Sequence, residues 1–224
     1  MPAKAEEEAP PSRVDFVVNA IREGIRVGEY VPGQRLVESD LTQAFGISRG
    51  PLREAMRRLA GDGLVVIEPH KGVAVRKMSA EDLEELYDVR RAMESLAARL
   101  AAKHIDEGDN RARLKALVDA MRAHKKGSDV MAYTALNEEF HQLIVEMSGN
   151  RYLHNLVNQL RVPIFRYQFN RFLDNDAKKN SIDEHQAIAK AILERDGNKA
   201  EKAMRHHVNH SSQLTQAIAR QGQQ

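Results

Sequence analysis

The sequence contains no cysteine and no tryptophan, and only 5% of its residues are aromatic. Without thiols the chain can form neither disulfide bonds nor thiolate metal sites, and it fits a reducing compartment. No apolar run approaches the roughly 20 residues that a membrane-spanning helix needs, and the N-terminus has no apolar signal core. We therefore expect a cytoplasmic protein with no membrane segment.

The net charge of the chain is also small. The formal value is +2 over 224 residues, which does not by itself indicate nucleic-acid binding. Alanine, leucine, glutamate, arginine and lysine are frequent instead, and these residues favour helices. We expect a mainly α protein in three parts: a disordered acidic tail at 1–12, a winged helix-turn-helix at 13–77 and an all-α antiparallel helical bundle at 78–224.

Short elements fill the region after the tail. Apolar residues at helical spacing alternate with turn residues, and Gly46 suits the end of the second helix. Ser48 is the expected cap of the third helix, and Pro69 begins the turn of a two-stranded hairpin. The expected elements are helices at 13–28, 39–45 and 48–62 and strands at 64–67 and 73–75.

Beyond residue 78 the pattern predicts long helices only. Ser79 and Asp82 resemble a capping box at the start of the first one, and Pro163 is expected to kink or divide the fourth. Such a series folds most simply into an antiparallel bundle. The expected helices are 80–104, 109–126, 129–147, 151–173, 175–195 and 198–220.

The third short helix has one basic face. Arg49, Arg53 and Arg57 recur every four residues, while the apolar residues of the helix lie on the opposite side. A solvated basic face is the ordinary reading of such a helix. The preceding turn and the following hairpin instead indicate a recognition helix, since arginine binds phosphates and reads guanine in the major groove.

The N-terminal region resembles the GntR family of bacterial regulators. The carrying segments are GEYVPGQRL at 28–36, ESDL at 38–41, FGISRGPLREA at 45–55, GLV at 63–65 and KG at 71–72. This resemblance implies operator contacts at the start of the recognition helix, at one residue outside it and at the hairpin tip. The implied residues are Arg35, Ser48, Arg49, Gly50, Pro51, Arg53, His70, Lys71 and Gly72.

The C-terminal region, from 79 to about 218, resembles the FCD effector domain of the FadR subfamily. The carrying segments are LYDVRRAME at 86–94, NEEFH at 137–141, SGN at 148–150, EHQAI at 184–188 and the pair HH at 206–207. This resemblance implies a divalent metal ion held inside the bundle by one carboxylate and three histidines. The matching positions are Asn137, His141, His185 and His207.

The residues themselves are compatible with that metal site. Asn137 and His141 lie one turn apart on one helix face, and imidazole binds zinc and nickel well, so we expect one of these ions. Asn137 stands where the family often has aspartate, and a neutral amide is a weaker ligand. His206 and His210 are expected to neighbour the last ligand, with His206 pointing elsewhere.

An anionic effector is the second expected ligand. Arg90 and Glu94 form an i,i+4 pair that is ordinarily a surface salt bridge. The resemblance implies instead that Arg90 faces the effector cavity and binds a small carboxylate or hydroxy acid. Further candidates for this cavity are Glu94, Arg161, Arg166 and Tyr167.

These expectations combine into a homodimeric, metabolite-responsive transcription regulator that is not an enzyme. It is a repressor or an activator, and a repressor is the preferred interpretation. Two recognition helices would read the half-sites of a pseudo-palindromic operator, and the metabolite would control binding. Two alternatives stay open. One is a metalloenzyme that uses the three histidines with a glutamate as base. The other is a non-specific DNA-binding protein, which would bind any sequence with a steep salt dependence.

Overall fold

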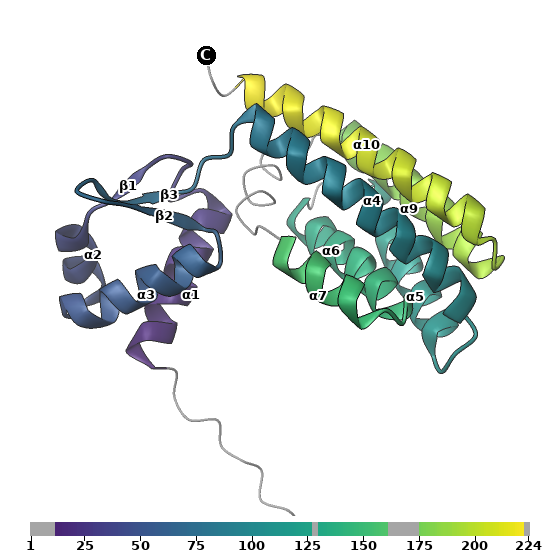
Figure 1. Ribbon diagram of the computed structural model, residues 1–224, viewed down its shortest axis with the longest axis horizontal. Helices are drawn as coiled ribbons and strands as arrows, with labels where there is room; N and C mark the ends of the chain where they lie inside the picture. Colours follow the sequence, from purple (N-terminus) through teal and green to yellow (C-terminus); the bar gives the residue numbers. More distant parts are fainter. Residues whose placement is uncertain (1–11, 127–129, 161–174, 222–224) are drawn as a thin grey trace, which may run out of the picture. The chain divides into compact units, whose positions relative to one another are not determined.

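The computed structural model describes residues 12–126, 130–160 and 175–221 (Figure 1). Within these residues the chain divides into two compact units that meet in the sequence between Lys77 and Met78. The predicted tail up to residue 11 lies outside the described residues. So do Pro163 and the part of the helix predicted at 151–173 that follows residue 160.

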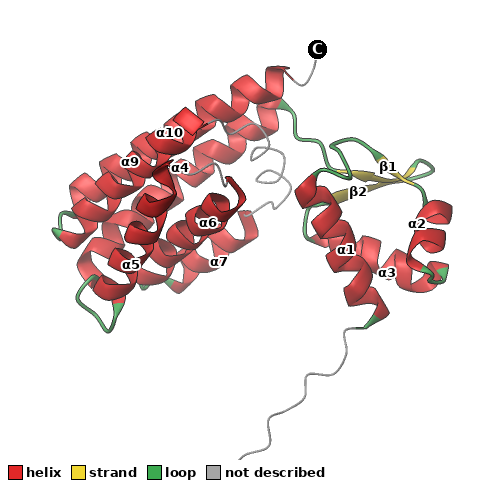
Figure 2. Ribbon diagram, turned by 180° about the vertical axis from the view of Figure 1, so that it is seen from behind, coloured by secondary structure: helices red, strands yellow, loops and turns green. Residues whose placement is uncertain are grey.

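The first unit combines three helices with a small antiparallel sheet of strand order β1-β3-β2 (Figure 2). Its helices are α1 (Arg13–Val27), α2 (Glu38–Phe45) and α3 (Arg49–Gly61), and its strands are β1 (Arg35–Leu36), β2 (Val65–Glu68) and β3 (Gly72–Val75). The sequence predicted β2 and β3 but missed β1. Two residues carry no periodicity, and β1 becomes visible only through its pairing of Arg35 with Ala74.

Both ends of α1 follow from local chemistry. Ser12, which was predicted to belong to the tail, caps the helix. Its side chain accepts a hydrogen bond from the Asp15 amide, and the Asp15 carboxylate accepts one from the Ser12 amide. Gly28 ends the helix with a φ of 81°, a left-handed conformation that costs glycine little. Buried apolar residues of α1 then meet those of α3 and the sheet, including Ile21, Leu59 and Val75.

The turn between α2 and α3 determines where α3 begins. Gly46 has a φ of 61°, and the Ile47 amide donates to the Thr42 carbonyl at 3.2 Å. Ser48 occupies the N-cap position, but its side chain makes no capping hydrogen bond, contrary to the sequence prediction. The Ser48 residue is instead exposed at the first turn of α3.

The second unit is entirely helical in its described residues. It contains α4 (Ala80–His104), α5 (Asn110–Ala123), η1 (His124–Lys126), α6 (Val130–Met147), α7 (Arg151–Leu160), α9 (Asn175–Leu193) and α10 (Gly197–Gln221). Helices α4 and α10 lie side by side along most of their length, and α9 packs on both (Figures 1 and 2). The capping box of Ser79 and Asp82 is present at the start of α4.

Polar side chains interrupt the apolar interior of this bundle. Phe140 is fully buried there and makes edge-on contacts with the rings of His141 and His185. The buried charged and imidazole side chains of the bundle are costly to desolvate unless they have partners. They are Glu94, His141, Lys178, His185 and His207. Among the described residues, no helix is long and apolar enough to cross a membrane.

Candidate metal centre and DNA-reading surface

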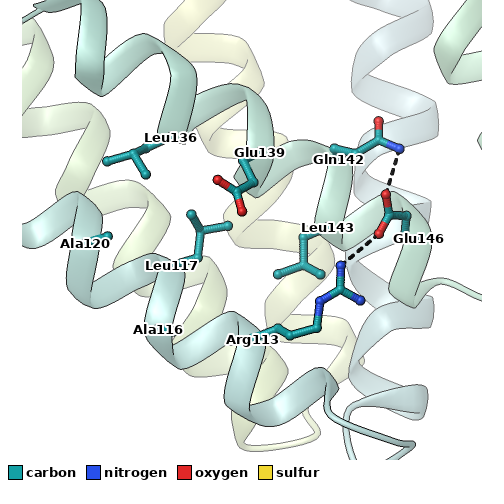
Figure 3. A pocket seen from close by; sticks show the side chains of 9 residues that line it. All are labelled: Arg113, Ala116, Leu117, Ala120, Leu136, Glu139, Gln142, Leu143 and Glu146. Atoms are coloured by element: carbon teal, nitrogen blue, oxygen red, sulfur yellow. Dashed lines mark hydrogen bonds and ion pairs between the residues drawn. The ribbon is translucent and has the colours of Figure 1, made fainter. Parts of the chain in front are cut away.

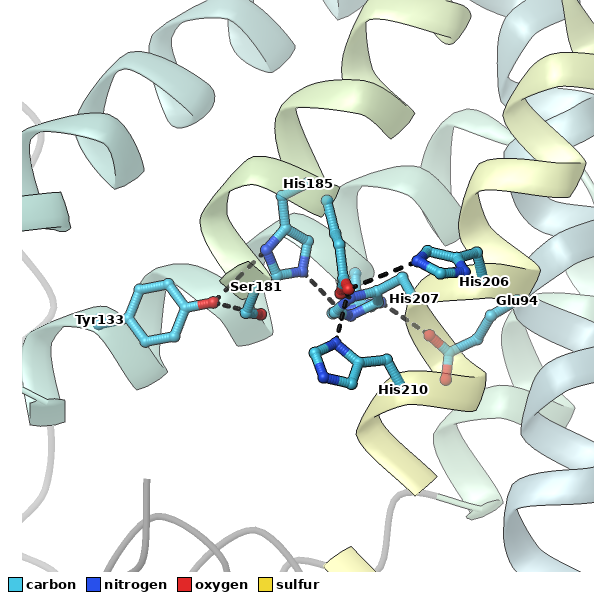
Figure 4. Close-up of polar contacts among 9 residues, drawn as sticks. Glu94, Tyr133, Ser181, His185, His206, His207 and His210 are labelled. Atoms are coloured by element: carbon cyan, nitrogen blue, oxygen red, sulfur yellow. Dashed lines mark hydrogen bonds and ion pairs between the residues drawn. The ribbon is translucent and has the colours of Figure 1, made fainter. Parts of the chain in front are cut away.

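Three buried imidazoles converge between the helices of the second unit. His141 comes from α6, His185 from α9 and His207 from α10, and Figure 4 shows the last two. The Nε2 atom of His141 lies 3.3 Å from Nε2 of His185 and 3.3 Å from Nε2 of His207. Two nitrogens that bind one tetrahedral zinc ion at 2.0–2.1 Å are about 3.3 Å apart, so the spacing fits a shared ion.

A carboxylate supports His207 from the side away from this cluster. The Nδ1–H of His207 donates to Glu184 Oε2 at 2.7 Å. Burial alone would raise the pKa of Glu184, but the hydrogen bond from His207 lowers that pKa below its ordinary value. An ionised acceptor at Nδ1 leaves the Nε2 lone pair of His207 directed at the cluster, as in known metal-binding histidines.

A second carboxylate stands behind His141. Glu94 Oε2 lies 2.7 Å from His141 Nδ1, but this contact does not have the geometry of a hydrogen bond. Glu94 Oε1 accepts from Arg90 Nε at 2.8 Å. Burial opposes the ionisation of Glu94, yet Arg90 and then His141 hold its pKa well below the ordinary value. Glu94 is therefore a buried anion between one cation and one candidate ligand.

His185 has neutral partners instead. Its Nδ1 lies 3.5 Å from the hydroxyl of Tyr133, which donates to Ser181 Oγ at 2.6 Å (Figure 4). All three histidines thus have an oxygen behind Nδ1 while their Nε2 atoms face one another.

Burial keeps two of these rings uncharged. It lowers the pKa of His141 to about 4 despite the nearby Glu94. It also lowers the pKa of His185 well below the ordinary value, and His207 and His141 add to that shift. Neutral imidazole is the form that binds a metal ion. The donor set, its protonation and its spacing all fit a borderline divalent cation.

The remaining predicted residues of the second unit are placed less completely. Asn137 lies on α6, one turn before His141, and is half-buried. The Arg90 side chain is only 20% exposed, and its guanidinium lies 4.8 Å from the centre of the Tyr87 ring. The predicted effector contacts Arg161, Arg166 and Tyr167 lie outside the described residues.

Sequence reasoning missed the support that the two glutamates give. Glu184 was predicted only as a member of the EHQAI segment and as one of the glutamates that could act as a base, and Glu94 as the i,i+4 partner of Arg90 and a residue of the effector cavity. The available signal for Glu184 was its position directly before His185 in the EHQAI segment. A single sequence contains no pattern that shows which carboxylate of one helix will contact a histidine of another helix.

The bundle also has a surface hollow of about 360 Å³ between α5 and α6 (Figure 3). Leu117, Leu136 and Leu143 contribute apolar side chains, and an ion pair of Arg113 with Glu146 at 3.1 Å closes one end. Among the described residues, neither the predicted metal ligands nor Arg90 and Glu94 line this hollow.

The basic face of α3 is exposed as predicted. Its apolar residues Leu52, Met56 and Leu59 are buried in the first unit. Arg53 binds Glu38 of α2 through Nε and Nη2 at 3.0 and 3.2 Å. Arg49 forms no ion pair with any described residue, and it stands in the first turn of the helix, where the dipole also favours anions.

Arg35 and the hairpin tip lie together. The Arg35 guanidinium donates to the backbone carbonyl of Lys71, and β1 pairs with β3 beside it. His70 adopts a left-handed φ of 62° and Gly72 one of 88°, which makes the turn tight. The sheet therefore places a residue from outside the recognition helix next to the tip that follows β2.

Two family profiles match the chain. The FCD domain family matches residues 85–210, and the family described as bacterial regulatory proteins, gntR family, matches residues 13–75. Together they cover both units.

Curated relatives and solved structures agree with these matches. The HTH-type transcriptional repressor GlaR of Escherichia coli K12 is 31% identical over 81% of this chain and 86% of its own length. The uncharacterized HTH-type transcriptional regulator YdhC of Bacillus subtilis 168 is 29% identical over 92% of both chains. A solved structure of a putative transcriptional regulator GntR from Rhodococcus sp. RHA1 has the same fold, with a TM-score of 0.73 at 23% identity, over 92% of this chain and 98% of that one.

Proposed function

This chain belongs to the GntR family of bacterial transcription regulators and carries an FCD domain, and from that premise we propose that it is a metal-dependent, metabolite-responsive repressor. DNA binding by the first unit and control by the second are the shared plan of the family. The relatives are transcription regulators and not enzymes, so the metalloenzyme alternative falls away.

The observation that supports metal dependence is the convergence of three buried Nε2 atoms. His141, His185 and His207 would hold a zinc or nickel ion, with Asn137 as a further ligand. When bound, such an ion supplies a Lewis-acidic centre with positions open to a carboxylate or hydroxyl oxygen. Arg90 would add a positive charge for the same anionic ligand.

The names of two relatives support repression. GlaR of Escherichia coli K12 and a D-xylose utilization operon protein of Paenarthrobacter nicotinovorans are both named as repressors, the latter as a probable one. We propose that two copies of this chain bind the half-sites of a pseudo-palindromic operator. Binding of the effector would make the protein release the operator, and the coupling free energy between the two binding events would be about 1–3 kcal/mol.

Elemental analysis of the tag-free protein tests the metal part directly. We expect one zinc or nickel ion in the buried cluster and its loss in His185→Ala. Gel shifts with the protein's own upstream DNA, with and without small hydroxy acids, then test control. Unchanged metal content in His185→Ala would exclude the buried site, and equal affinity for random DNA would favour the non-specific alternative.

A further inference from the structure

The carboxylate behind His207 also faces a second pair of histidines. His206 and His210 lie one helical turn apart on α10 (Figure 4). Glu184 Oε1 accepts from His210 Nδ1 at 2.6 Å and lies 3.8 Å from His206 Nε2. The other oxygen of Glu184, Oε2, is the one that holds His207.

This outer cluster is open to solvent, unlike the buried one. The His206 side chain is 77% exposed and that of His210 is 30% exposed, whereas that of His207 is 4% exposed. His206 points away from the three buried ligands, as predicted. Its Nε2 lies on the solvent side of Glu184, the carboxylate that supports His207.

The donor chemistry is that of a divalent metal ion. Two histidines four apart on one helix face are a recurrent pair of ligands, and a carboxylate from a neighbouring helix completes three. Ligand atoms on one tetrahedral ion are about 3.3 Å apart, whereas Glu184 Oε1 lies 2.6 Å from His210 Nδ1 and 3.8 Å from His206 Nε2, so both imidazoles must rotate to share an ion with Glu184. Exposed side chains can close that difference by small rotations about χ1 and χ2.

We propose that Glu184, His206 and His210 form a second, solvent-accessible site for zinc, nickel or copper. This site does not depend on the proposed function, because its three donors remain whether or not the buried cluster holds an ion. It binds more weakly than the buried cluster, since an ion must replace the hydrogen bond between His210 and Glu184.

Glu184 connects the two sites. Its oxygens lie 2.6 Å from His210 and 2.7 Å from His207. An ion on Oε1 draws charge away from Oε2 and so weakens the support of His207, which orients a buried ligand. The outer site therefore fills after the buried one and lowers its affinity for metal.

The test is metal stoichiometry in tag-free, full-length protein. Equilibrium dialysis against zinc or nickel, followed by elemental analysis, should give about two ions per chain in the wild type. The double variant His206→Gln with His210→Gln should hold about one. The double variant His141→Gln with His185→Gln should also hold about one, and its copper spectrum by electron paramagnetic resonance should show nitrogen ligation.

A matched control is His104→Gln. His104 Nδ1 also lies 2.7 Å from a glutamate oxygen, that of Glu107, but it has no second histidine one turn away. We expect this variant to bind as many ions as the wild type. If His206→Gln with His210→Gln holds the same number of ions as the wild type, the outer site is excluded, whatever the buried cluster binds.

Discussion

The two units each contain an arginine bound to a glutamate, at nearly the same distance but in opposite surroundings. Arg53 and Glu38 of the first unit meet at 3.0 Å, with side chains 58% and 35% exposed. Arg90 and Glu94 of the second meet at 2.8 Å, with side chains 20% and 6% exposed. Exposure, more than distance, decides what such a pair can do.

The exposed pair is replaceable. Water and salt screen it, and a DNA phosphate or a guanine can take the place of the glutamate. The buried pair is not replaceable in this way, since removal of one partner leaves a charge without water. Arg53 could therefore exchange Glu38 for a group of the DNA, whereas Arg90 must keep Glu94 as a partner even when it also binds the proposed anionic effector.

The largest expected effect is on DNA recognition. Arg49→Ala with Arg53→Ala removes two guanidinium groups from α3, and each base contact of this kind contributes about 1–3 kcal/mol. We expect operator binding to weaken by about 2–6 kcal/mol in a competition gel shift, while circular dichroism shows an unchanged helix content. If affinity survives within about tenfold, which is 1.4 kcal/mol, the basic face of α3 does not read the operator.

The next effect would distinguish the two ion pairs by stability. Glu94→Ala leaves Arg90 unpaired in the bundle and should lower the free energy of unfolding by about 3–5 kcal/mol, measured in urea. Glu38→Ala is the matched control, because Arg53 stays solvated when its partner is lost. Similar unfolding midpoints for the two variants would contradict the contrast between exposed and buried pairs.

A smaller effect concerns the carboxylate behind His207. Glu184→Gln should weaken metal binding about 10–100-fold, since an amide holds the imidazole less well than a carboxylate does. Competition with a chromogenic chelator measures the change. The control is Glu107→Gln, which alters an exposed glutamate that contacts His104 at the same 2.7 Å. An equal loss of metal affinity in both variants would show that contact with a histidine does not by itself identify a carboxylate that supports a metal ligand.

The smallest effect belongs to Glu38. Glu38→Gln removes the carboxylate that pairs with Arg53, so that Arg53 can neutralise one more DNA phosphate. The slope of log affinity against log salt should become steeper by up to about 0.9. Binding isotherms at several salt concentrations give this slope. A shallower slope would mean that Glu38 is needed to hold Arg53 in place.

The parts that the sequence predicted are those with a period or a spacing. The basic face of α3 follows from residues four apart, and the capping box of Ser79 is a local motif. In contrast, β1 consists of two residues whose strand character depends on a partner about 40 positions later. Ser48 failed as a side-chain cap because the residue type permits that bond without requiring it.

The histidine cluster was predicted in a different way. Its ligands came from a resemblance to a family, and the spacing of Asn137 and His141 was only compatible with it. The i,i+4 relation of Arg90 to Glu94 was visible in the sequence, but the burial of that pair was not. Burial depends on how α4 packs against the other helices, and one sequence does not specify that packing in enough detail.

The short strand β1 holds Arg35 at a fixed position relative to the hairpin tip. Because Arg35 pairs in register with β3 and donates to the Lys71 carbonyl, its distance from the hairpin tip is fixed before any DNA is bound. If Arg35 and the hairpin tip both bind the operator, the operator must present its two contact groups at one set separation along the duplex. A base pair inserted between these groups would add about 3.4 Å and rotate one of them by about a tenth of a turn around the helix axis, so that only one of the two could be reached at a time.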